Sequence, residues 1–390
     1  MPEGLTGIDR ETQEQLRNTI ARFARERLLP IEEAVAEADR IPPEIVQEMR
    51  EMGLFGLSIP PEYGGLGLSM EAEAAIVMAL CYASPVFRSV IGTSVGIGSQ
   101  GILIDGTEEQ KQEFLPRVAS GEWIASFALT EPDSGSDAQS IQARAVKDGG
   151  DYVISGTKRY ITNAPQAGFF TLMAKTKERE AGRSDHISAF LVPADLPGIT
   201  IGRPDKKMGQ RGAHTADVHF DAVRVPERFL LGGIEGRGFK TAMKVLDRGR
   251  LHLAAVCVGV AKRLIDEAAG YAAERKQFGQ IIGDFQLVQA LLADCQTETY
   301  AAECMTLETA RKFDTGQRVA MDAACCKYFA SEMVGRVADR AVQVHGGAGY
   351  MAEYAVERLY RDVRLFRIYE GTSQIQQLVI GRQMIRDRSA

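Results

Sequence analysis

The sequence has no uninterrupted apolar segment long enough to cross a membrane. Its most apolar window, residues 251–261, contains His252 and is closed by Lys262 and Arg263, whereas a membrane-spanning helix needs about 20 apolar residues. The first residues are charged and show no basic segment followed by an apolar one, so nothing directs secretion. We therefore expect a soluble, cytoplasmic protein with no membrane span.

Blocks of basic residues are also absent. Lys and Arg number 46 against 52 Asp and Glu, which gives a formal net charge of -6. No basic cluster is present that could neutralise several phosphates of a nucleic acid backbone. A nucleic acid is therefore not an expected partner.

Metal-binding cysteine patterns are missing as well. The six cysteines form no C-x-x-C pair and have no paired histidines nearby, so the sequence predicts no metal site. Because their surroundings are apolar or helical, we expect all six to be reduced residues of the core. They are Cys81, Cys257, Cys295, Cys304, Cys325 and Cys326.

The overall amino-acid composition is that of a globular protein. The chain has 390 residues, of which 45% are hydrophobic and 25% charged, and its glycines and prolines are spread along the chain. This composition excludes disorder, collagen and coiled-coil arrays. At about 150 residues per domain, two or three domains or one large multi-part core are expected.

Hydrophobic periodicity predicts that the first 120 residues are helical. Apolar residues recur at helical spacing over residues 9–39, where Pro30 should end or kink the helix. Thr107 and Gln110 have the spacing of a capping box. Further helices are predicted over residues 41–53, 69–83, 85–105 and 107–119.

The pattern of residue types along the sequence changes at Gly121 and again after Gly232. Between them, short runs rich in β-branched and aromatic residues alternate with turn residues, which is typical of strands. Residues 236–390 are helical again, and a long periodic stretch over 284–344 is broken only near Gly316. We therefore expect an N-terminal helical domain over 1–120, a central β domain over 121–232 and a C-terminal helical domain over 233–390.

Residues 96–101 satisfy the G-x-G-x-x-G pattern of dinucleotide-binding turns. That interpretation requires a strand before the glycines and an acidic residue about 20 positions later. Here the glycines lie in a helical region, and the β block lacks the alternating helices of a parallel, doubly wound sheet. We interpret them as close-packing positions between helices.

Two segments of the β region combine residues that could carry chemistry. The loop over residues 127–137, FALTEPDSGSD, offers hydroxyls and backbone donors that could cradle a phosphate or hydrogen-bond the edge of a ring. An ordinary turn would look the same. Residues 160–163, YITN, place an aromatic beside a hydroxyl at a strand end, although a plain strand terminus explains them equally well.

Three segments of the helical region offer similar alternatives. Asp247 and Arg250 share a helix face, either at a ligand or as a surface ion pair. Residues 274–279, ERKQFG, suit a phosphate and a ring, or a solvated helix end. Residues 343–350, QVHGGAGY, permit close backbone approach, or simply cap a helix.

The sixth segment contains Glu370, in IYEGTSQ. Ser373 and Gln376 have capping-box spacing, so a helix should begin there. Flanking apolar residues should desolvate Glu370, raise its pKa and make it a better base, whereas a helix N-terminus favours the ionised carboxylate. The alternative is a carboxylate that only complements a helix dipole.

In their order and contexts the six segments resemble the acyl-CoA dehydrogenase family of flavoproteins, over nearly the whole chain. FALTEPDSGSDA matches one family signature, and HGGAGY with RDVRLFRIYEGTSQIQ matches the other. The resemblance implies an α+β fold with an N-terminal all-α domain, a central antiparallel β domain and a C-terminal four-helix bundle. Together they would enclose FAD and a CoA thioester.

The resemblance also implies roles for individual residues. Those expected to contact the flavin or back its ring are Phe127, Leu129, Thr130, Ser136, Tyr160, Ile161 and Thr162, where Tyr160 replaces the commoner Trp or Phe. Those expected to bind the FAD of a neighbouring subunit are Arg275, Gln277, Phe278, Gln343, Val344, Gly346, Gly347, Thr372 and Gln374. Those expected to contact the substrate are Ser136, Asp247, Arg250 and Gly371.

By the same resemblance Glu370 is the catalytic base. It would take the α-proton of a saturated acyl-CoA while flavin N5 accepts the β-hydride, giving a trans-2-enoyl-CoA, with the thioester carbonyl bound by the Glu370 backbone N–H. Some branched-chain members carry the base at the position of Gly249, where glycine cannot serve. The expected electron acceptor is an electron-transfer flavoprotein, and the expected assembly is a homo-oligomer, a dimer of dimers.

Two other functions and one substrate question stay open at this stage. A flavin-dependent oxidase or monooxygenase on the same fold is the main alternative, and a non-catalytic protein that binds acyl-CoA or flavin is the second. Ser89, Gly92 and Thr93 should lie near the closed end of the acyl pocket. Their small side chains would leave room for an acyl chain longer or more branched than butyryl.

Overall fold

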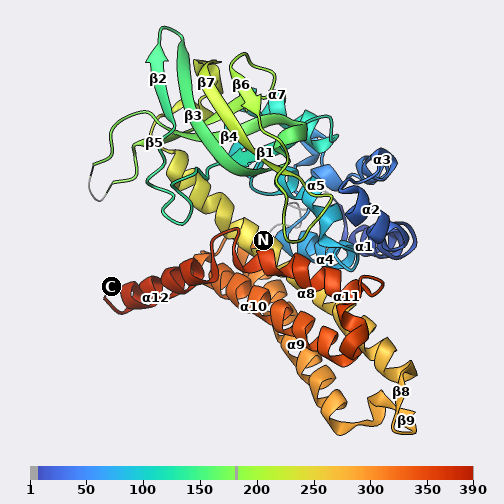
Figure 1. Ribbon diagram of the computed structural model, residues 1–390. Coiled ribbons are helices and arrows are strands. Elements are labelled where there is room, and N and C mark those ends of the chain that lie inside the picture. Colours follow the sequence, from blue (N-terminus) through green and yellow to red (C-terminus); the bar gives the residue numbers. More distant parts are fainter. Residues whose placement is uncertain (1–7, 181–182, 390) are drawn as a thin grey trace.

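The computed structural model describes residues 8–180 and 183–389, which form helices, then a sheet, then helices again (Figure 1). The sheet lies at one end of the molecule, and long helices extend away from it. Across the described residues, no helix has the length and apolar character needed to cross a membrane.

The N-terminal region begins with a helix that is interrupted before Pro30. Helix α1 spans Arg10–Phe23 and passes into a π-helical turn, Ala24–Leu28, and a 3-10 turn, Leu29–Ile31, before α2, Glu32–Ala38. Pro30 has no N–H to donate to the preceding turn, so a regular α-helix cannot continue through it. The predicted kink is confirmed.

Helices α3, Pro43–Glu51, and α4, Met70–Leu80, follow as predicted. The helix predicted over residues 85–105 is wrong, because the structure has two helices, α5, Pro85–Val95, and α6, Gln100–Asp105. A Cβ on Gly98 would lie 2.8 Å from Ala125 Cβ, so this glycine is a close-packing position, although its neighbour is a strand. Helix α7, Glu108–Ala119, has the predicted capping box.

The central sheet is mixed rather than purely antiparallel. Its path runs β1-β4-β2-β3-β7-β6, with β5 paired to β4. The β1–β4 and β2–β4 pairs are parallel and the others antiparallel. Parallel pairing needs a long crossover connection, which the β2–β3 hairpin supplies between β1 and β4. The strands are β1, Ile124–Ala128; β2, Arg144–Asp148; β3, Asp151–Thr162; β4, Ala167–Lys175; β5, Ile187–Pro193; β6, Ile199–Ile201; and β7, Thr215–Pro226.

The C-terminal region is built on α8, Gly238–Glu274, α9, Gln286–Asp314, and α10, Ala320–His345, which pack on one another. The predicted break near Gly316 separates α9 from α10. A hairpin of β8, Lys276–Gln277, and β9, Gln280–Ile281, joins α8 to α9 at the end of the bundle away from the sheet (Figure 1). The shorter α11, Ala355–Val363, and α12, Ser373–Ser389, pack on α10, so the bundle has more helices than the expected four.

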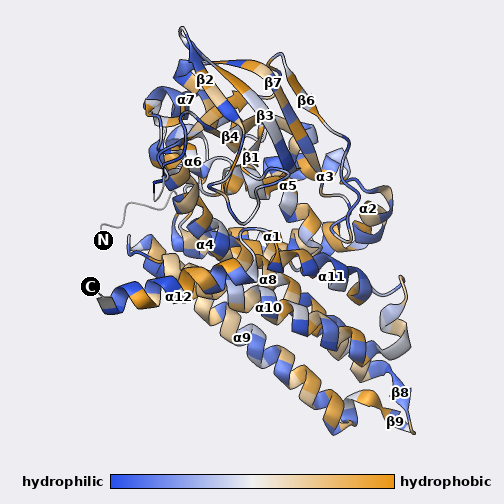
Figure 2. Cartoon of the chain, turned by 60° about the vertical axis from the view of Figure 1, so that its left-hand side comes forward, coloured by the Kyte–Doolittle hydropathy of each residue, from blue (hydrophilic) through white to orange (hydrophobic). Residues whose placement is uncertain are grey.

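Helix α8 ties the regions together. Its residues 251–261 are all buried, so the most apolar window of the sequence is a core helix. It packs against α4 as well as against the bundle. In Figure 2 the apolar colour is concentrated along the inner faces of these helices and within the sheet.

The cysteine prediction is only partly correct. All six thiols are free, and Cys81, Cys257, Cys295 and Cys326 are buried. Cys304 is exposed and Cys325 is half-buried, because both project from helix positions that do not face the core.

Candidate active site

Glu370 lies in a short loop before α12 that is held in an unusual backbone conformation. Glu370 and Gly371 both have left-handed torsions, φ 57° and 85°. Such a conformation costs free energy for a residue other than glycine and persists only where surrounding contacts impose it. Gln376 Nε2 donates to both carbonyl oxygens, at 3.0 and 3.1 Å, and Lys327 Nζ donates to the Gly371 carbonyl at 2.7 Å.

The helix after this loop is capped differently from the prediction. Thr372 Oγ1 accepts a hydrogen bond from Ile375 N at 3.2 Å, so Thr372 is the cap and Ser373 is the first helical residue. The Ser373 hydroxyl donates to Glu332 Oε1 instead. The predicted Ser373–Gln376 capping box is therefore wrong, since both side chains are engaged by the tertiary structure.

The Glu370 carboxyl group points toward α8. Its Oε2 is buried without a hydrogen-bond partner and lies 2.7 Å from the place where a Cβ on Gly249 would stand. Burial raises the pKa of Glu370, as predicted. The effect that opposes burial comes from three cations rather than from the helix terminus: Arg88, Arg250 and Lys327 lower this pKa.

Two of these cations are fixed by hydrogen bonds. Arg250 Nη1 is 2.6 Å from Asp247 Oδ1, and the Arg250 side chain is only 7% exposed, so this is not the surface ion pair considered as an alternative. Burial lowers the pKa of Lys327 to about 8. Lys327 is therefore still mostly charged near neutral pH beside Glu370.

The structure brings the two predicted β segments together. Arg159 N donates to the Thr130 carbonyl at 2.8 Å, and Ser126 Oγ donates to the Thr162 carbonyl at 2.8 Å. The loop that begins at Phe127 therefore runs beside the strand end at residues 160–162. The side chains of Thr130 and Thr162 are half-buried, and Ser136 is exposed.

An aromatic ring is presented at this strand end. The β3–β7 register shifts between Lys158 and Ile161, and Tyr160 within this bulge has φ 57° and is 59% exposed. Bulges commonly re-aim a side chain. An exposed ring beside half-buried hydroxyls and loop backbone fits the expected flavin. Leu129 and Ile161 are buried, so they can offer mainly backbone groups.

The remaining predicted cofactor residues gather elsewhere. Tyr271 stacks on His345 with centroids 4.4 Å apart, which brings the C-terminal ends of α8 and α10 together. Beside them Phe278 is 93% exposed with φ 53°. This end of the bundle lies far from the sheet in Figures 1 and 2. It carries Arg275, Gln277, Phe278, Gln343, Val344, Gly346 and Gly347.

Within this group Val344 is buried in the bundle core, so its side chain is not available to a cofactor. Thr372 and Gln374 are separate again, at the start of α12, where Gln374 is exposed. One chain therefore presents the predicted cofactor residues in three separate groups rather than as one set.

The room expected beside Gly92 is already filled. A Cβ on Gly92 would lie 2.7 Å from Cζ of Arg88, so the guanidinium of Arg88 covers this glycine. Thr93 Oγ1 accepts from Asn163 Nδ2 at 2.7 Å, and Ser89 Oγ donates to the Pro85 carbonyl. The prediction of a roomy pocket from small side chains alone overlooked Arg88.

Sequence reasoning also missed three basic side chains, of which His252 and Lys158 are buried and Arg88 is half-buried. Arg88, His252 and Lys158 each interrupt an apolar helix face or strand, and such an interruption is the signal that could have identified them. The partners of His252 and Lys158, which are Glu73 and Glu131, lie too far away in the sequence for any local pattern to indicate the pairing.

Comparisons with known proteins match all three regions of the chain. Family models match in chain order: "Acyl-CoA dehydrogenase, N-terminal domain" over residues 10–122, "middle domain" over 126–223 and "C-terminal domain" over 236–385. The chain is 42% identical to "Probable acyl-CoA dehydrogenase YngJ" of Bacillus subtilis (strain 168), covering 96% of this chain and 98% of that protein.

Two further proteins are similar over most of the chain. The "Caffeyl-CoA reductase-Etf complex subunit CarC" of Acetobacterium woodii is 38% identical, over 96% of this chain and 99% of that protein. A solved acyl-CoA dehydrogenase from Bacillus anthracis, complexed with FAD, superimposes with a TM-score of 0.91 at 35% identity, covering 100% of this chain and 69% of that one.

Proposed function

Because this chain belongs to the acyl-CoA dehydrogenase family, whose members are FAD-dependent oxidoreductases acting on acyl-CoA, we propose that Glu370 is the base that removes the α-proton of its substrate. The observation that supports this role is the free, buried Oε2 of Glu370 against the side-chain-less face of Gly249. A desolvated carboxylate with an open lone pair is a stronger base than a solvated one.

The proposed reaction converts a saturated acyl-CoA into a trans-2-enoyl-CoA. Glu370 receives the α-proton, and bound FAD supplies the acceptor for the hydride that leaves the β-carbon. The left-handed backbone at Glu370 and Gly371, clamped by Lys327 and Gln376, holds the carboxyl in place before the substrate arrives. Burial raises the pKa of Glu370, whereas Arg88, Arg250 and Lys327 lower it and so favour the ionised carboxylate.

The test is anaerobic reduction of the flavin by a panel of straight, branched and ring-bearing acyl-CoAs. Glu370→Gln keeps the size of the side chain and removes its basicity, so the reduction rate should fall by about 10²- to 10⁴-fold. Glu113→Gln, which changes only a surface pair with Arg228, is the matched control. Reduction by Glu370→Gln at the parent rate would show that another group is the base.

We further propose that the FAD site is completed by a second copy of the chain. In Figure 1 the β8–β9 hairpin, whose turn holds Phe278, lies far from strand β3, which holds Tyr160, so its exposed residues do not reach a cofactor bound at that strand in the same chain. Phe278→Ser should lower both the FAD content and the oligomer mass measured by light scattering. Met208→Ser, which changes another exposed apolar residue, should alter neither. A monomer with one FAD per chain would contradict this proposal.

Electrons are proposed to pass to an electron-transfer flavoprotein. The similarity to CarC, whose name places that protein in an Etf complex, supports this acceptor. Turnover that consumes oxygen without an added acceptor would instead favour an oxidase or a monooxygenase on this fold.

A further inference from the structure

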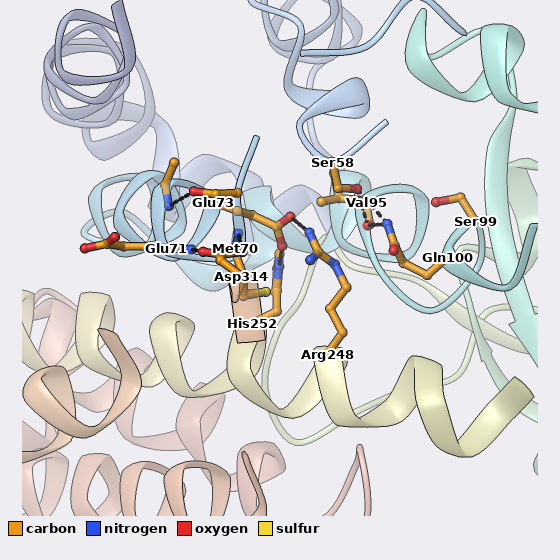
Figure 3. A network of polar contacts seen from close by, with 12 residues as sticks. Ser58, Met70, Glu71, Glu73, Val95, Ser99, Gln100, Arg248, His252 and Asp314 are labelled. Atoms are coloured by element: carbon orange, nitrogen blue, oxygen red, sulfur yellow. Dashed lines mark hydrogen bonds and ion pairs between the residues drawn. The ribbon is translucent and has the colours of Figure 1, made fainter. Parts of the chain in front are cut away.

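A buried carboxylate on α4 organises two basic side chains of α8. Glu73 is completely buried, and its Oε1 lies 2.7 Å from Nδ1 of His252 while its other oxygen pairs with Arg248. Figure 3 shows both side chains rising from α8 to meet Glu73. His252 is itself only 1% exposed. This arrangement lies one helical turn from Gly249, against which the Glu370 carboxyl is packed.

The second nitrogen of His252 fixes its protonation. Arg88 Nε lies 2.7 Å from His252 Nε2, and an arginine N–H can only donate. His252 Nε2 is therefore the acceptor, so the ring is neutral and carries its proton on Nδ1, which donates to Glu73. Burial and the Arg88 charge lower the pKa of His252 to about 4, in agreement with a neutral ring.

The same helix face brings Arg88 to the base. Gly249 and His252 are three residues apart on α8, and residues at this spacing are neighbours about 5 to 6 Å apart. Glu370 Oε2 contacts the position of Gly249, and Arg88 is bonded to His252. The guanidinium and the carboxyl group therefore lie on adjacent positions of one helix face.

Among the described residues Arg88, like Lys327, also lacks a paired carboxylate. Glu73 pairs with Arg248, and Asp247 pairs with Arg250. Within the described part of the chain, no carboxylate lies within 4.0 Å of Arg88, and its only hydrogen bond goes to His252. Its positive charge is therefore not cancelled and can act on Glu370.

We propose that the buried Glu73–His252 pair is a positioning device that holds the Arg88 guanidinium beside Glu370 and so keeps the base ionised. The inference rests on the proposed role of Glu370. The charged groups that face Glu370 are Arg88 from α5, Arg250 from α8 and Lys327 from α10. Of these, only Arg88 depends on a neutral histidine for its position.

The experiment measures the pH dependence of flavin reduction in the holoenzyme at saturating acyl-CoA. A charge about 6 Å away at an effective dielectric of about 20 changes a pKa by about two units, so Arg88→Met should move the rising limb of the profile up by about one to two pH units. His252→Leu removes the acceptor for Arg88 and should move the limb in the same direction by at least about half a unit.

His252→Gln is the conservative rescue. Its amide oxygen reaches the place of Nε2 and can still accept from Arg88, so its profile should coincide with that of the parent. Arg311→Gln, which breaks an exposed pair with Glu71 between α4 and α9, is the matched control and should also leave the profile unchanged.

Gly92→Ala provides an independent test if the His252 variants fail to fold. The added Cβ would lie 2.7 Å from the Arg88 guanidinium carbon and displaces it without removing any charge. An upward shift of the limb is expected again. The proposal is overturned if the limb stays in place in Arg88→Met or in Gly92→Ala, or if His252→Gln shifts it as far as His252→Leu.

Failure of the positioning role can be distinguished from failure of the proposed function. If Glu370→Gln reduces flavin at the parent rate, Glu370 is not the base and Arg88 is not positioned beside a base. If Glu370→Gln is inactive while the profiles of the Arg88 and His252 variants match the parent, the base is correct and the positioning role is wrong.

Discussion

The buried ion pair between Lys158 and Glu131 should be essential for the loop that is expected to meet the flavin. Lys158 is 0% exposed, and its Nζ lies 2.7 Å from Glu131 Oε1 and 3.0 Å from the Leu129 carbonyl. Burial lowers the pKa of Lys158 to about 8, so the amine is still mostly charged at neutral pH. Lys158→Met keeps the length of the side chain and removes both hydrogen bonds.

The expected loss of stability follows from the few hydrogen-bond partners that Glu131 would keep. Its carboxylate would stay buried with only the backbone N–H groups of Gln142 and Ala143, and removing one partner of such a pair costs about 3 to 5 kcal/mol. With about 2.1 cal/mol/K of unfolding entropy per residue over 390 residues, the melting temperature should fall by about 4 to 6 °C.

Thermal unfolding of Lys158→Met, Glu131→Gln and the double variant checks this reasoning. Lys158→Met should melt earlier than the parent and lose FAD, because the Leu129 carbonyl is no longer held. Adding Glu131→Gln removes the orphan charge and should recover at least about half of the loss, since a neutral amide is far less costly to bury than a carboxylate. A single variant as stable as the parent, or a double variant that loses the sum of both changes, would refute the argument.

Three further outcomes follow from buried contacts. Gly249→Ala places a Cβ against the Glu370 carboxyl and should slow flavin reduction by at least about tenfold with little change in melting temperature, as rapid-mixing kinetics would show. The pKa of His252 is lowered from 6.5 to about 4, so its contribution of about 3 kcal/mol to stability is complete above pH 6.5 and lost as the pH falls through 4. His252→Gln should therefore lose less stability than the parent between these pH values in urea titrations. Asn163→Ala removes buried bonds to Ser89 and Thr93 and should cost about 1 to 3 kcal/mol in the same assay.

The sequence determined what depends on neighbours along the chain. The order of helices, strands and helices, the interruption before Pro30 and the Thr107–Gln110 capping box all follow from local spacing and local hydrogen bonds. The two signature segments likewise carried the family assignment. These features could be predicted because each depends on residues within a few positions of one another.

The tertiary structure alone decided which side chains meet. The parallel β1–β4 pair, the cap at Thr372 and the filling of the space at Gly92 all differ from local expectation, because distant segments supply the partners. The charged groups around Glu370 come from three separate helices, α5, α8 and α10. Burial raises the pKa of Glu370, and these cations oppose the rise. Electrostatic interactions act through space, so only the folded arrangement of Glu73, His252 and Arg88 could show which cation faces the base.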